Sequence, residues 1–470
     1  MSFKLVLLWT DAMIFLLLAV TLVGGWWIKQ HPHLLLPWRR LFKSRMGMVS
    51  LLVLSLFVLV GLLDSIHYRV ALPDKNGSGQ TVYAAVELSL FDTLVGDMRT
   101  RTEKTYSAPL AVYLYAKESI GTAEGKIFRD YPRLKHGGAH LKDPQVEHTG
   151  DVIKRSLYGL FAGWLGGVLA SLLFVSVAAA RSRTSVRQWV EARQHTPLNA
   201  LLATLVLIAM LFGLTANLAG AYHVLGTDKV GQDVLYLSLK SIRTGLVIGT
   251  VTTLVMLPIA LFLGLAAGYF RGWVDDVIQY IYTVLSSIPD VLLIAAAVLM
   301  MQVTLEKHAE WFSSAVERAD MRLLILCLIL GVTSWTGLCR LLRGEALKLR
   351  ELEYIQAAQA FGVTSMRILS RHILPNVMHI VLIAVVMGFS TLVLAEAVLS
   401  YVGVGVDPST NSFGTLINNA RLEMGREPMV WWTLAAAFSF MLVLVLSANL
   451  FADAVRDAFD PRLNRTGDAK

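Results

Sequence analysis

The chain has 470 residues, of which 55% are hydrophobic and only 16% are charged, and its mean hydropathy is +0.58. A soluble protein of this length has no room to bury so much apolar surface. We therefore interpret the chain as a membrane protein whose apolar surface faces lipid. The net charge of +8 does not indicate a nucleic-acid partner, because the basic residues cluster beside apolar segments.

Nine apolar segments are long enough to cross a bilayer, since a spanning helix needs about 20 apolar residues. The sequence therefore predicts an all-α membrane protein with spans at about 5–27, 46–66, 157–180, 197–219, 244–269, 277–303, 323–343, 376–402 and 430–452. The first segment is long, contains Asp11 and lacks a small-x-small cleavage site. We interpret it as a retained membrane anchor with Trp26 and Trp27 at the interface.

The basic residues of the short loops predict the orientation of these spans. Lysines and arginines gather at 28–45, at 181–196, around 344–375 and in the C-terminal tail, which all fall on one side of the membrane. This side is predicted to be cytoplasmic, with the N-terminus outside and the C-terminus inside. Residues 67–155 are also basic, but so long a loop is largely exempt from the rule, and we predict an external insert.

A turn-rich segment precedes the span at 244–269. Gly226 and Gly231 permit tight backbone turns, and Asp228 is predicted to cap the helix that enters the membrane. Thr227 and Asp233 complete the motif. Its role is either that of a structural cap or that of a contact with a substrate or a binding protein.

Three features inside the spans bear on transport. Gly264 and Gly268 form a small-xxx-small face suited to close helix packing. Pro289 is predicted to bend or break its helix, and irregular backbone is common along transport paths. Glu396 lies deep in an apolar span, where a charge is costly, so we expect it to face the bundle interior. It either lines a pathway or makes a hydrogen bond to a helix neighbour.

A short polar island separates the spans at 323–343 and 376–402. Tyr354, Ala357, Ala358 and Phe361 fall at i, i+3, i+4 and i+7 and so form one stripe on a helix. The pattern predicts that Gly362 ends this helix in a left-handed conformation. It also predicts that Ser365 caps a second helix and that Pro375 marks the start of the next span. Such a helix–glycine–helix element on a membrane surface indicates a docking device that transmits force.

No metal site is predicted. Cys327 and Cys339 lie twelve residues apart in one predicted helix, or about 18 Å along its axis, so they do not pair with each other. His31 and His33 have a spacing that is poor for one helix face.

Together these motifs resemble those of dipeptide and oligopeptide ABC importer permeases. The island is similar to the family's Glu-Ala-Ala loop, with Gln356 in place of the glutamate and Glu353 one helical turn earlier as a substitute. The matching positions are Ala357, Ala358, Gly362, Leu374 and Pro375. Further similar stretches lie at 225–235, 264–276, 286–289, 394–406 and 454–462, so that the resemblance covers about 223–462 and the span at 46–66.

The resemblance implies a type I importer permease fold with six core transmembrane helices plus about three additional spans. It divides the chain into an N-terminal anchor with a basic loop (1–45), the first core helix (46–66), an external insert (67–155), an inserted transmembrane hairpin (156–219), a core permease domain (220–462) and a cytoplasmic tail (463–470).

The resemblance also implies partners. A second homologous permease would complete a heterodimer in the bacterial inner membrane. Two ATPase subunits would dock on the loop at about 344–375. A periplasmic binding protein would deliver peptides or related small solutes, including nickel, glutathione or sugars. The implied coupling residues are Glu353, Tyr354, Gln356, Ala357, Ala358, Phe361, Gly362, Leu374 and Pro375, and the pathway candidates are Pro289 and Glu396. The chain has no G-x-x-x-x-G-K-[ST] motif, so ATP and Mg are expected in the partner ATPases and no enzyme activity or cofactor in this chain.

Two alternatives remain. An ion-coupled secondary transporter needs intramembrane charge pairs in repeated halves, and Asp11, Asp64 and Glu396 are few and scattered. A membrane-anchored enzyme acting through the 67–155 insert needs a set of nucleophile, base and acid, and the insert's candidates, such as His140, His148 and Asp143, show no recognisable spacing.

Overall fold

The computed structural model of the protein describes residues 3–71, 83–84, 86–121, 127–191, 197–312 and 314–459. The chain divides into two compact units. The first consists of Met1–Val6, Trp38–Arg243 and Asn411–Ser447, and the second of Leu7–Pro37, Thr244–Thr410 and Ala448–Lys470. The predicted tail at 463–470 lies outside the described residues.

The apolar segments form helices, as predicted. Among the described residues, eight helices are long and apolar enough to span a bilayer, or nine when one sharply bent pair is counted as a span. They are α1 (Trp9–Gln30), α3 (Arg45–Asp64), α6 (Pro144–Arg181), α8 (Leu198–Ala219), α9 (Val234–Phe270), α12 (Ala315–Arg350), α15 (Leu374–Tyr401) and α17 (Trp432–Phe459), and the bent pair is α10 (Trp273–Ser287) with α11 (Asp290–Lys307). Each of the nine predicted segments falls on one of these helices or on the bent pair.

Several helices extend beyond their predicted ends. α6 begins at Pro144, within the region that we assigned to the external insert. A side-chain oxygen of Asp143 accepts a hydrogen bond from the amide of Gln145 at 3.2 Å and caps this helix. Hydropathy marks only the part of a helix that lies in lipid, whereas a capped helix can continue into water.

The residues outside the spans include two small antiparallel sheets in the first unit. β1 (Phe3–Val6), β2 (His67–Val70) and β3 (Leu88–Ser89) form one sheet, in which His67 pairs with both Val6 and Ser89, and β4 (Glu118–Gly121) pairs with β5 (Ile127–Asp130). The prediction that the first span begins near residue 5 is therefore wrong for its first residues, which form a strand. Besides the helices of the loop between α12 and α15, the described residues form the short helices α2 (Pro32–Leu41), α4 (Leu90–Leu94), α5 (Gly96–Thr100), α7 (Val186–Glu191), η1 (Ala309–Trp311) and α16 (Phe413–Glu423).

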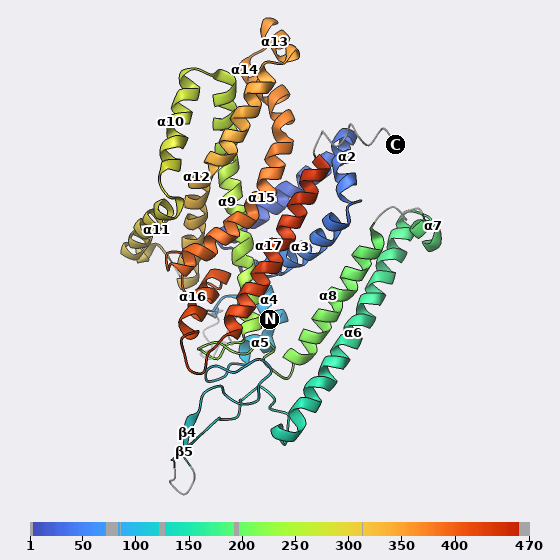
Figure 1. Cartoon of the computed structure of the whole chain (residues 1–470), viewed down its shortest axis with the longest axis vertical. Helices are drawn as coiled ribbons and strands as arrows, with labels where there is room; N and C mark the ends of the chain where they lie inside the picture. The colour runs from blue at the N-terminus through green and yellow to red at the C-terminus, as the bar shows by residue number, and fades with distance from the viewer. Residues whose placement is uncertain are drawn as a thin grey trace. The chain divides into compact units, whose positions relative to one another are not determined.

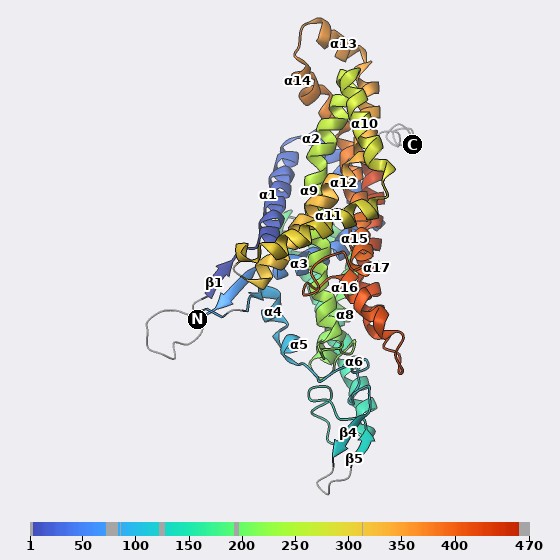
Figure 2. The same cartoon turned by 90° about the vertical axis from the view of Figure 1, so that its left-hand side faces the viewer.

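In the first unit, α6 and α8 lie side by side as an antiparallel hairpin with α7 at one end (Figures 1 and 2). The seam is made by Gly159, Gly163 and Gly167 of α6, which face Ala209 and Gly213 of α8. A Cβ atom added to Gly213 would lie 2.8 Å from the Cα atom of Gly163. The two backbones are therefore in direct contact, as small-residue faces permit in membranes.

In the second unit, α10 and α11 meet at an angle of 87°. α10 ends at Ser287, and Pro289 occupies the cap position of α11. The prediction that Pro289 bends or breaks its helix is confirmed. Its ring cannot donate a backbone hydrogen bond, so the helical ladder is interrupted there.

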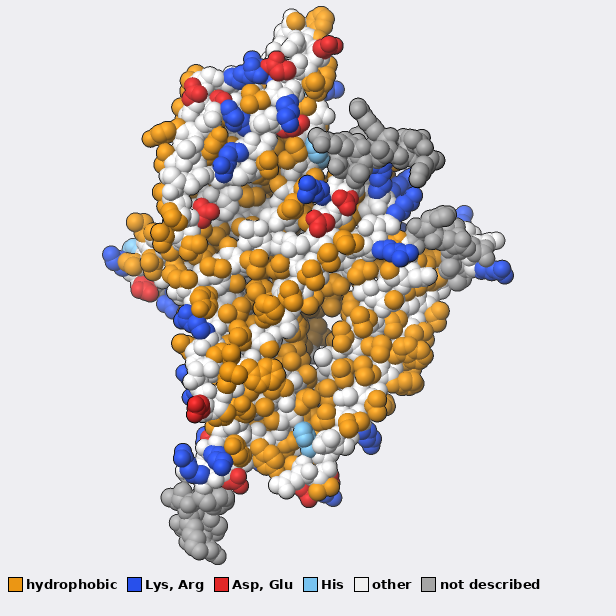
Figure 3. All heavy atoms as spheres, viewed as in Figure 1, with side chains coloured by type: hydrophobic (Ala, Val, Ile, Leu, Met, Phe, Trp, Pro, Cys, Tyr) orange, Lys and Arg blue, Asp and Glu red, His pale blue; other side chains and the backbone are white. Residues whose placement is uncertain are grey.

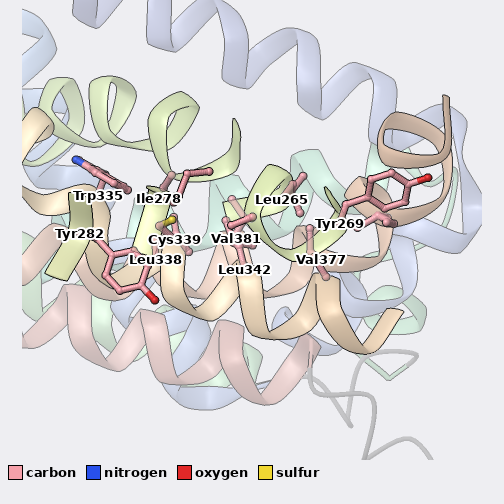
Figure 4. Packing of buried hydrophobic residues seen from close by; sticks show 14 of the residues in the cluster. Leu265, Tyr269, Ile278, Tyr282, Trp335, Leu338, Cys339, Leu342, Val377 and Val381 are labelled. Atoms are coloured by element: carbon pink, nitrogen blue, oxygen red, sulfur yellow. The ribbon is translucent and has the colours of Figure 1, made fainter. Parts of the chain in front are cut away.

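The core of the second unit lies along α12. Gly264 and Gly268 of α9 pack against it, and a Cβ atom on Gly268 would lie 2.6 Å from the Cβ atom of Ala346. The small-xxx-small prediction is thus confirmed, and its partner is α12. Leu342 and Cys339 continue the buried cluster towards Trp335, as Figure 4 shows.

Candidate functional site

The predicted helix–glycine–helix loop lies at one end of the second unit (Figures 1 and 2). α13 (Glu353–Ala360), α14 (Ser365–Ile368) and a π-helical turn, η2 (Leu369–Ile373), connect α12 to α15. Of the predicted stripe, Ala357 is exposed, Tyr354 is 47% exposed and Phe361 is 88% exposed, while Ala358 is half-buried. Most of the stripe therefore faces away from the chain's own core, and we call it the α13 face.

The opposite side of the loop is anchored. Ile355, Ile368 and Ile373 are fully buried. They belong to the same apolar cluster as Leu342 and Ala346 of α12. Close packing of this kind makes the loop a rigid extension of α12.

The end of α13 has the geometry that the sequence predicts. Gly362 has a φ of +74°. Its amide donates to the carbonyl of Gln359 at 2.9 Å, and the amide of Val363 donates to the carbonyl of Ala358 at 3.0 Å. This paired arrangement is a Schellman motif, which requires a left-handed residue at the glycine position.

The start of the second helix differs from the prediction. Thr364 occupies the cap position of α14, Ser365 is the first residue of the helix, and Thr364 makes no side-chain capping bond. Ser365 is therefore not the cap. Gly362 is left-handed and ends α13. Thr364 is extended and precedes the first residue of α14.

Leu374 and Pro375 begin α15, as predicted, but no break precedes them. The helix runs from Ser365 to Tyr401 through the π-helical turn η2. Proline lacks an amide hydrogen and crowds the preceding turn, and the wider π turn provides the room that the ring needs. Leu374 packs against the α12 cluster.

Polar contacts tie the loop to neighbouring helices. Asn376 donates from Nδ2 to the hydroxyl of Tyr354 at 3.1 Å, and Gln359 donates from Nε2 to the hydroxyl of Tyr269 at 3.3 Å. The guanidinium of Arg350 donates to the carbonyl of Tyr269 at 2.8 Å. α9, α12, α13 and α15 are thus joined at this end.

Gln356, at the position of the glutamate in the resembling family, makes a hydrogen bond within this chain. The amide group of Gln356 donates to the carbonyl of Glu351 at 3.3 Å, and the carboxylate of Glu351 pairs with Arg271. Glu353 is exposed at the start of α13. The acidic character of the loop therefore resides at Glu351 and Glu353 rather than at position 356.

The second predicted site is a tight turn before α9. Gly226 and Gly231 have φ values of +72° and +79°, as their glycine identity predicts. The Asp228 carboxylate accepts hydrogen bonds from the amides of Val230 and Gln232 at 2.9 and 2.8 Å. Asp228 therefore closes the turn.

The prediction that Asp228 caps the membrane helix is wrong. α9 begins at Val234, and its cap is the neighbouring Asp233. Oδ1 of Asp233 accepts from the amides of Leu235 and Tyr236 at 2.8 and 3.3 Å. The carboxylate of Asp228 instead binds amides within the turn.

The turn is bound to the external insert and to α17. The buried hydroxyl of Thr227 donates to the carbonyl of Thr105 at 2.9 Å and accepts from the amide of Ser107 at 2.7 Å. The indole of Trp432 donates to the carbonyl of Thr227 at 3.0 Å. These bonds favour the structural interpretation of the motif.

A buried carboxylate–histidine–carboxylate group completes this connection. His223 has Nδ1 at 2.8 Å from Asp233 and Nε2 at 3.4 Å from Glu103 of the insert. Glu103 also accepts hydrogen bonds from the backbone amides of residues 135–137. We call Glu103, His223 and Asp233 the insert latch.

In the insert latch, the charged forms of His223 and Glu103 stabilise each other. Burial alone would lower the pKa of His223, but its hydrogen bonds and the two carboxylate charges raise that pKa from 6.5 to about 9. Burial would raise the pKa of Glu103, whereas the neighbouring His223 and the hydrogen bonds from three backbone amides lower that pKa to about 2. At neutral pH the group is therefore a charged, hydrogen-bonded structural centre.

The two pathway candidates differ in their surroundings. Pro289 is exposed at the α10–α11 elbow, with Leu292 64% exposed beside it. Glu396 is only 1% exposed and accepts a hydrogen bond from Ser400 of the same helix at 2.6 Å. Glu396 thus faces the interior of its unit, as expected, and Pro289 lies on an open apolar surface.

The histidines of the insert have structural partners. His140 lies 2.8 Å from the carboxylate of Asp151, and Nε2 of His148 lies 2.8 Å from the carbonyl of Leu110. Both rings flank the ring of Tyr222. The third candidate of the insert, Asp143, caps α6.

Sequence reasoning missed three features. Ile355 lies between the stripe residues and gives no special signal, because an isoleucine is ordinary beside a membrane. Glu103 lies in the insert, far along the chain from His223, so no spacing pattern connects them. The run Gly159, Gly163 and Gly167 did carry a signal, since three glycines four residues apart predict close helix packing.

Comparisons with known proteins show what the chain is similar to. A family model described as "Binding-protein-dependent transport system inner membrane component" matches residues 260–465. The chain is 31% identical over 242 residues to the oligopeptide transport system permease protein OppC of Mycobacterium tuberculosis, covering 52% of this chain and 77% of the relative. It is 32% identical over 243 residues to the glutathione transport system permease protein GsiD of Pectobacterium atrosepticum. This match covers 51% of this chain and 73% of the relative.

Two further matches are weaker. The dipeptide transport system permease protein DppC of Lactococcus lactis is 30% identical over 240 residues, which is 51% of this chain and 64% of the relative. A solved chain of the MetNI methionine ABC transporter in an inward-facing conformation is 17% identical and covers 48% of this chain and 97% of its own length, with a TM-score of 0.36.

Proposed function

Because the chain belongs to the family of inner-membrane components of binding-protein-dependent transport systems, we propose that it forms half of the translocation pathway of an importer for peptides or related small solutes. It is a multi-pass permease subunit of an ABC importer and not an enzyme, and ATP is used by partner ATPase subunits. Peptides are the favoured substrate class because the relatives are named for oligopeptides, dipeptides and glutathione, which is itself a tripeptide.

The observation that supports this function best is the α13 face. This face is apolar and mostly exposed. It lies on a loop that packs against α12 through Ile355. An exposed aromatic residue such as Phe361 fits a pocket on a partner protein. We assign the ATPase contact to this face, with Gly362 fixing its angle and Glu353 at its edge.

Movement of a docked ATPase would pass along α12 and α15. The loop joins these two helices through buried contacts and through the bond between Asn376 and Tyr354. A rigid connection allows two states of the ATPases to bias two states of the membrane helices. This is the proposed transmission step.

The remaining partners are assigned by exposure. The apolar surface around Pro289 is proposed to face the second homologous permease and the pathway between the two chains. The side that carries the turn at 226–233 is proposed to face the periplasm and the binding protein, with the N-terminus on the same side. Glu396, buried and bonded within α15, is proposed to hold that helix in position rather than to touch substrate.

The test is a Phe361→Ser change in the complex co-expressed with its ATPase subunits and reconstituted in lipid. Because Phe361 is 88% exposed, the change leaves the fold intact. We expect loss of ATPase co-purification and of hydrolysis stimulated by the binding protein. Trp273→Ser is the matched control, since Trp273 is 77% exposed at the start of α10 and lies outside the α13 face.

Two results would contradict the proposal. One is wild-type co-purification and stimulation in the Phe361→Ser complex. The other is an equal loss in the Trp273→Ser complex, which would assign the effect to general surface disturbance. Uptake of radiolabelled di-, tri- and pentapeptides by proteoliposomes, against nickel and a disaccharide, would test the substrate class separately.

A further inference from the structure

The α6–α8 hairpin lies outside the residues 260–465 that match the family model. In the most apolar stretch of α8 no residue is buried, and in that of α6 only 22% of the residues are. Figure 3 shows hydrophobic side chains along the hairpin and basic side chains near its α7 end. The hairpin therefore presents most of its surface to something other than this chain.

One side of the hairpin is hollowed. A groove of about 660 Å³ runs between the two helices and is lined almost entirely by apolar atoms. Its walls include Trp164, Val168 and Leu172 of α6 and Leu202 and Val206 of α8. Because the glycine seam brings the backbones together, the large side chains stand on either side of it and form these walls.

The groove approaches the end of the hairpin that carries α7. α7 folds back so that Trp189 packs against Val175 and Ala179 of α6, with Leu198 and Leu202 of α8 beside it. Val175 and Leu202 also line the groove. The groove therefore reaches the base of the connecting segment.

Three arginines among the described residues lie at the end of α6 and in the connecting segment that follows. Arg181, Arg183 and Arg187 are exposed. Arg181 is the last residue of α6, and at 1.5 Å per residue it stands about 9 Å beyond Val175. A cluster of arginines at the end of membrane helices attracts anionic lipid headgroups.

Arg183 has an unusual backbone. Its φ is +55°, and the amide of Thr184 that follows it donates to the carbonyl of Ala179 at 3.2 Å. This is the helix-ending position at which glycine is normally found, and an arginine there is strained. A strained residue kept in place of glycine points to a use for its side chain.

We propose that the hairpin binds an anionic phospholipid, with an acyl chain in the groove and the phosphate at Arg181, Arg183 and Arg187. A helix of a partner protein fits the groove less well. Helices associate in membranes through small residues, and the glycines beside the groove, Gly163 and Gly167, are already used in the α6–α8 seam, while most of the groove lining is large apolar side chains. A flexible acyl chain suits walls made of leucine, valine and tryptophan, and the arginines complement its phosphate.

The test uses the full-length chain in phosphatidylcholine vesicles containing a fifth phosphatidylglycerol. One arm carries a diazirine on the acyl chain of phosphatidylglycerol and the other carries it on phosphatidylcholine. Mass spectrometry then compares the labelling of peptides 164–175 and 202–210. We expect the anionic lipid to label them at least about fivefold more strongly than the neutral lipid.

Two variants locate the headgroup site. The combined Arg181→Gln, Arg183→Gln and Arg187→Gln change should abolish the preference. Arg183→Gly should weaken it while relaxing the helix end, so a loss there is not a folding defect. The control is Lys142→Gln with Lys154→Gln, which removes two exposed cations near the opposite end of the hairpin.

A third variant, Val206→Trp, fills the groove and should reduce labelling by the anionic lipid to the level of the neutral one. Equal labelling by both lipids in the wild-type chain would overturn the proposal, as would a preference that survives removal of the three arginines. Loss of groove labelling when the second permease subunit is co-expressed would identify a protein helix as the occupant and would also overturn it. Free inorganic phosphate is excluded as the ligand if adding it in excess leaves the labelling unchanged, and competition by phosphate would overturn the lipid assignment.

Discussion

Nδ1 of His223 lies 2.8 Å from Oδ2 of Asp233, while Oδ1 of the same carboxylate caps α9. One aspartate thus joins the start of a membrane helix to the external insert through His223 and Glu103. The turn motif before α9 is therefore held by the insert, and the two are expected to be stabilised together.

The insert latch should make the insert sensitive to alkaline pH. Since the pKa of His223 is raised from 6.5 to about 9, its contribution to stability is complete below pH 6.5 and is lost as the pH rises through about 9. Since the pKa of Glu103 is lowered from 4.5 to about 2, its contribution is complete above pH 4.5 and is lost as the pH falls through 2. The latch is most stable between about pH 4.5 and 6.5.

Hydrogen–deuterium exchange of amides 135–137, normalised to unfolded peptide at each pH, would measure this. We expect protection to fall by up to about a hundredfold between pH 6.5 and 9.5, because the pKa of His223 is raised from 6.5 to about 9 and each pKa unit corresponds to a factor of ten. His223→Gln should show lower protection at pH 6.5 and little further change. A pH-independent wild-type profile would rule out this role.

Gly231→Ala should destabilise the turn before α9. The residue has a φ of +79°, and an added Cβ atom would overlap the backbone of Glu103. We expect a loss of about 2 kcal/mol or more in unfolding free energy and a lower melting temperature in detergent. Gly344→Ala, at an open position of α12, should leave the melting temperature unchanged or raise it slightly; equal effects of the two changes would contradict the assignment.

Gly163→Val should separate the hairpin seam. A Cβ atom at Gly163 would overlap the backbone at Ala209, whereas one at Gly166 would meet open space. We expect Gly163→Val to cost about 1–3 kcal/mol and Gly166→Val to cost much less. Thermal unfolding of the two proteins in the same lipid nanodiscs measures the difference, and a seam that tolerates both changes equally is not tightly packed.

Ile355→Ala should separate binding from transmission. The side chain is fully buried beneath α13, and its truncation should cost about 2–5 kcal/mol locally. Because the α13 face itself is unchanged, we expect the ATPase subunits still to co-purify, while hydrolysis stimulated by the binding protein falls several-fold. Ala360→Ser, at an exposed position of α13, is the control. Retained stimulation in Ile355→Ala would show that a rigid anchor is not needed.

Local patterns in the sequence predicted a large part of this protein. The helices follow from apolar length, because a segment in lipid must satisfy its own backbone hydrogen bonds. The left-handed Gly362 and the break at Pro289 follow from the backbone preferences of single residues. The exposure of most of the α13 face follows from helical spacing together with a polar setting.

Choices between neighbouring residues were decided only in the folded chain. Asp228 and Asp233 are both good capping residues, and so are Thr364 and Ser365 by type. In each case the helix starts where the preceding turn ends. The contacts of the turn determine that position. At the start of α9, Thr227 binds the insert, and Asp233 accepts from the first amides of the helix.

The sequence by itself determined the class of the protein, its membrane helices and the motif that identifies its family, because these depend on composition and on residues close together in the chain. The tertiary structure alone decided that Ile355 anchors the coupling loop, that Glu103 and His223 form one charged centre, and that the glycine seam leaves a groove beside it. These features depend on contacts between segments distant in sequence, and such contacts form only when burial and packing bring the segments together.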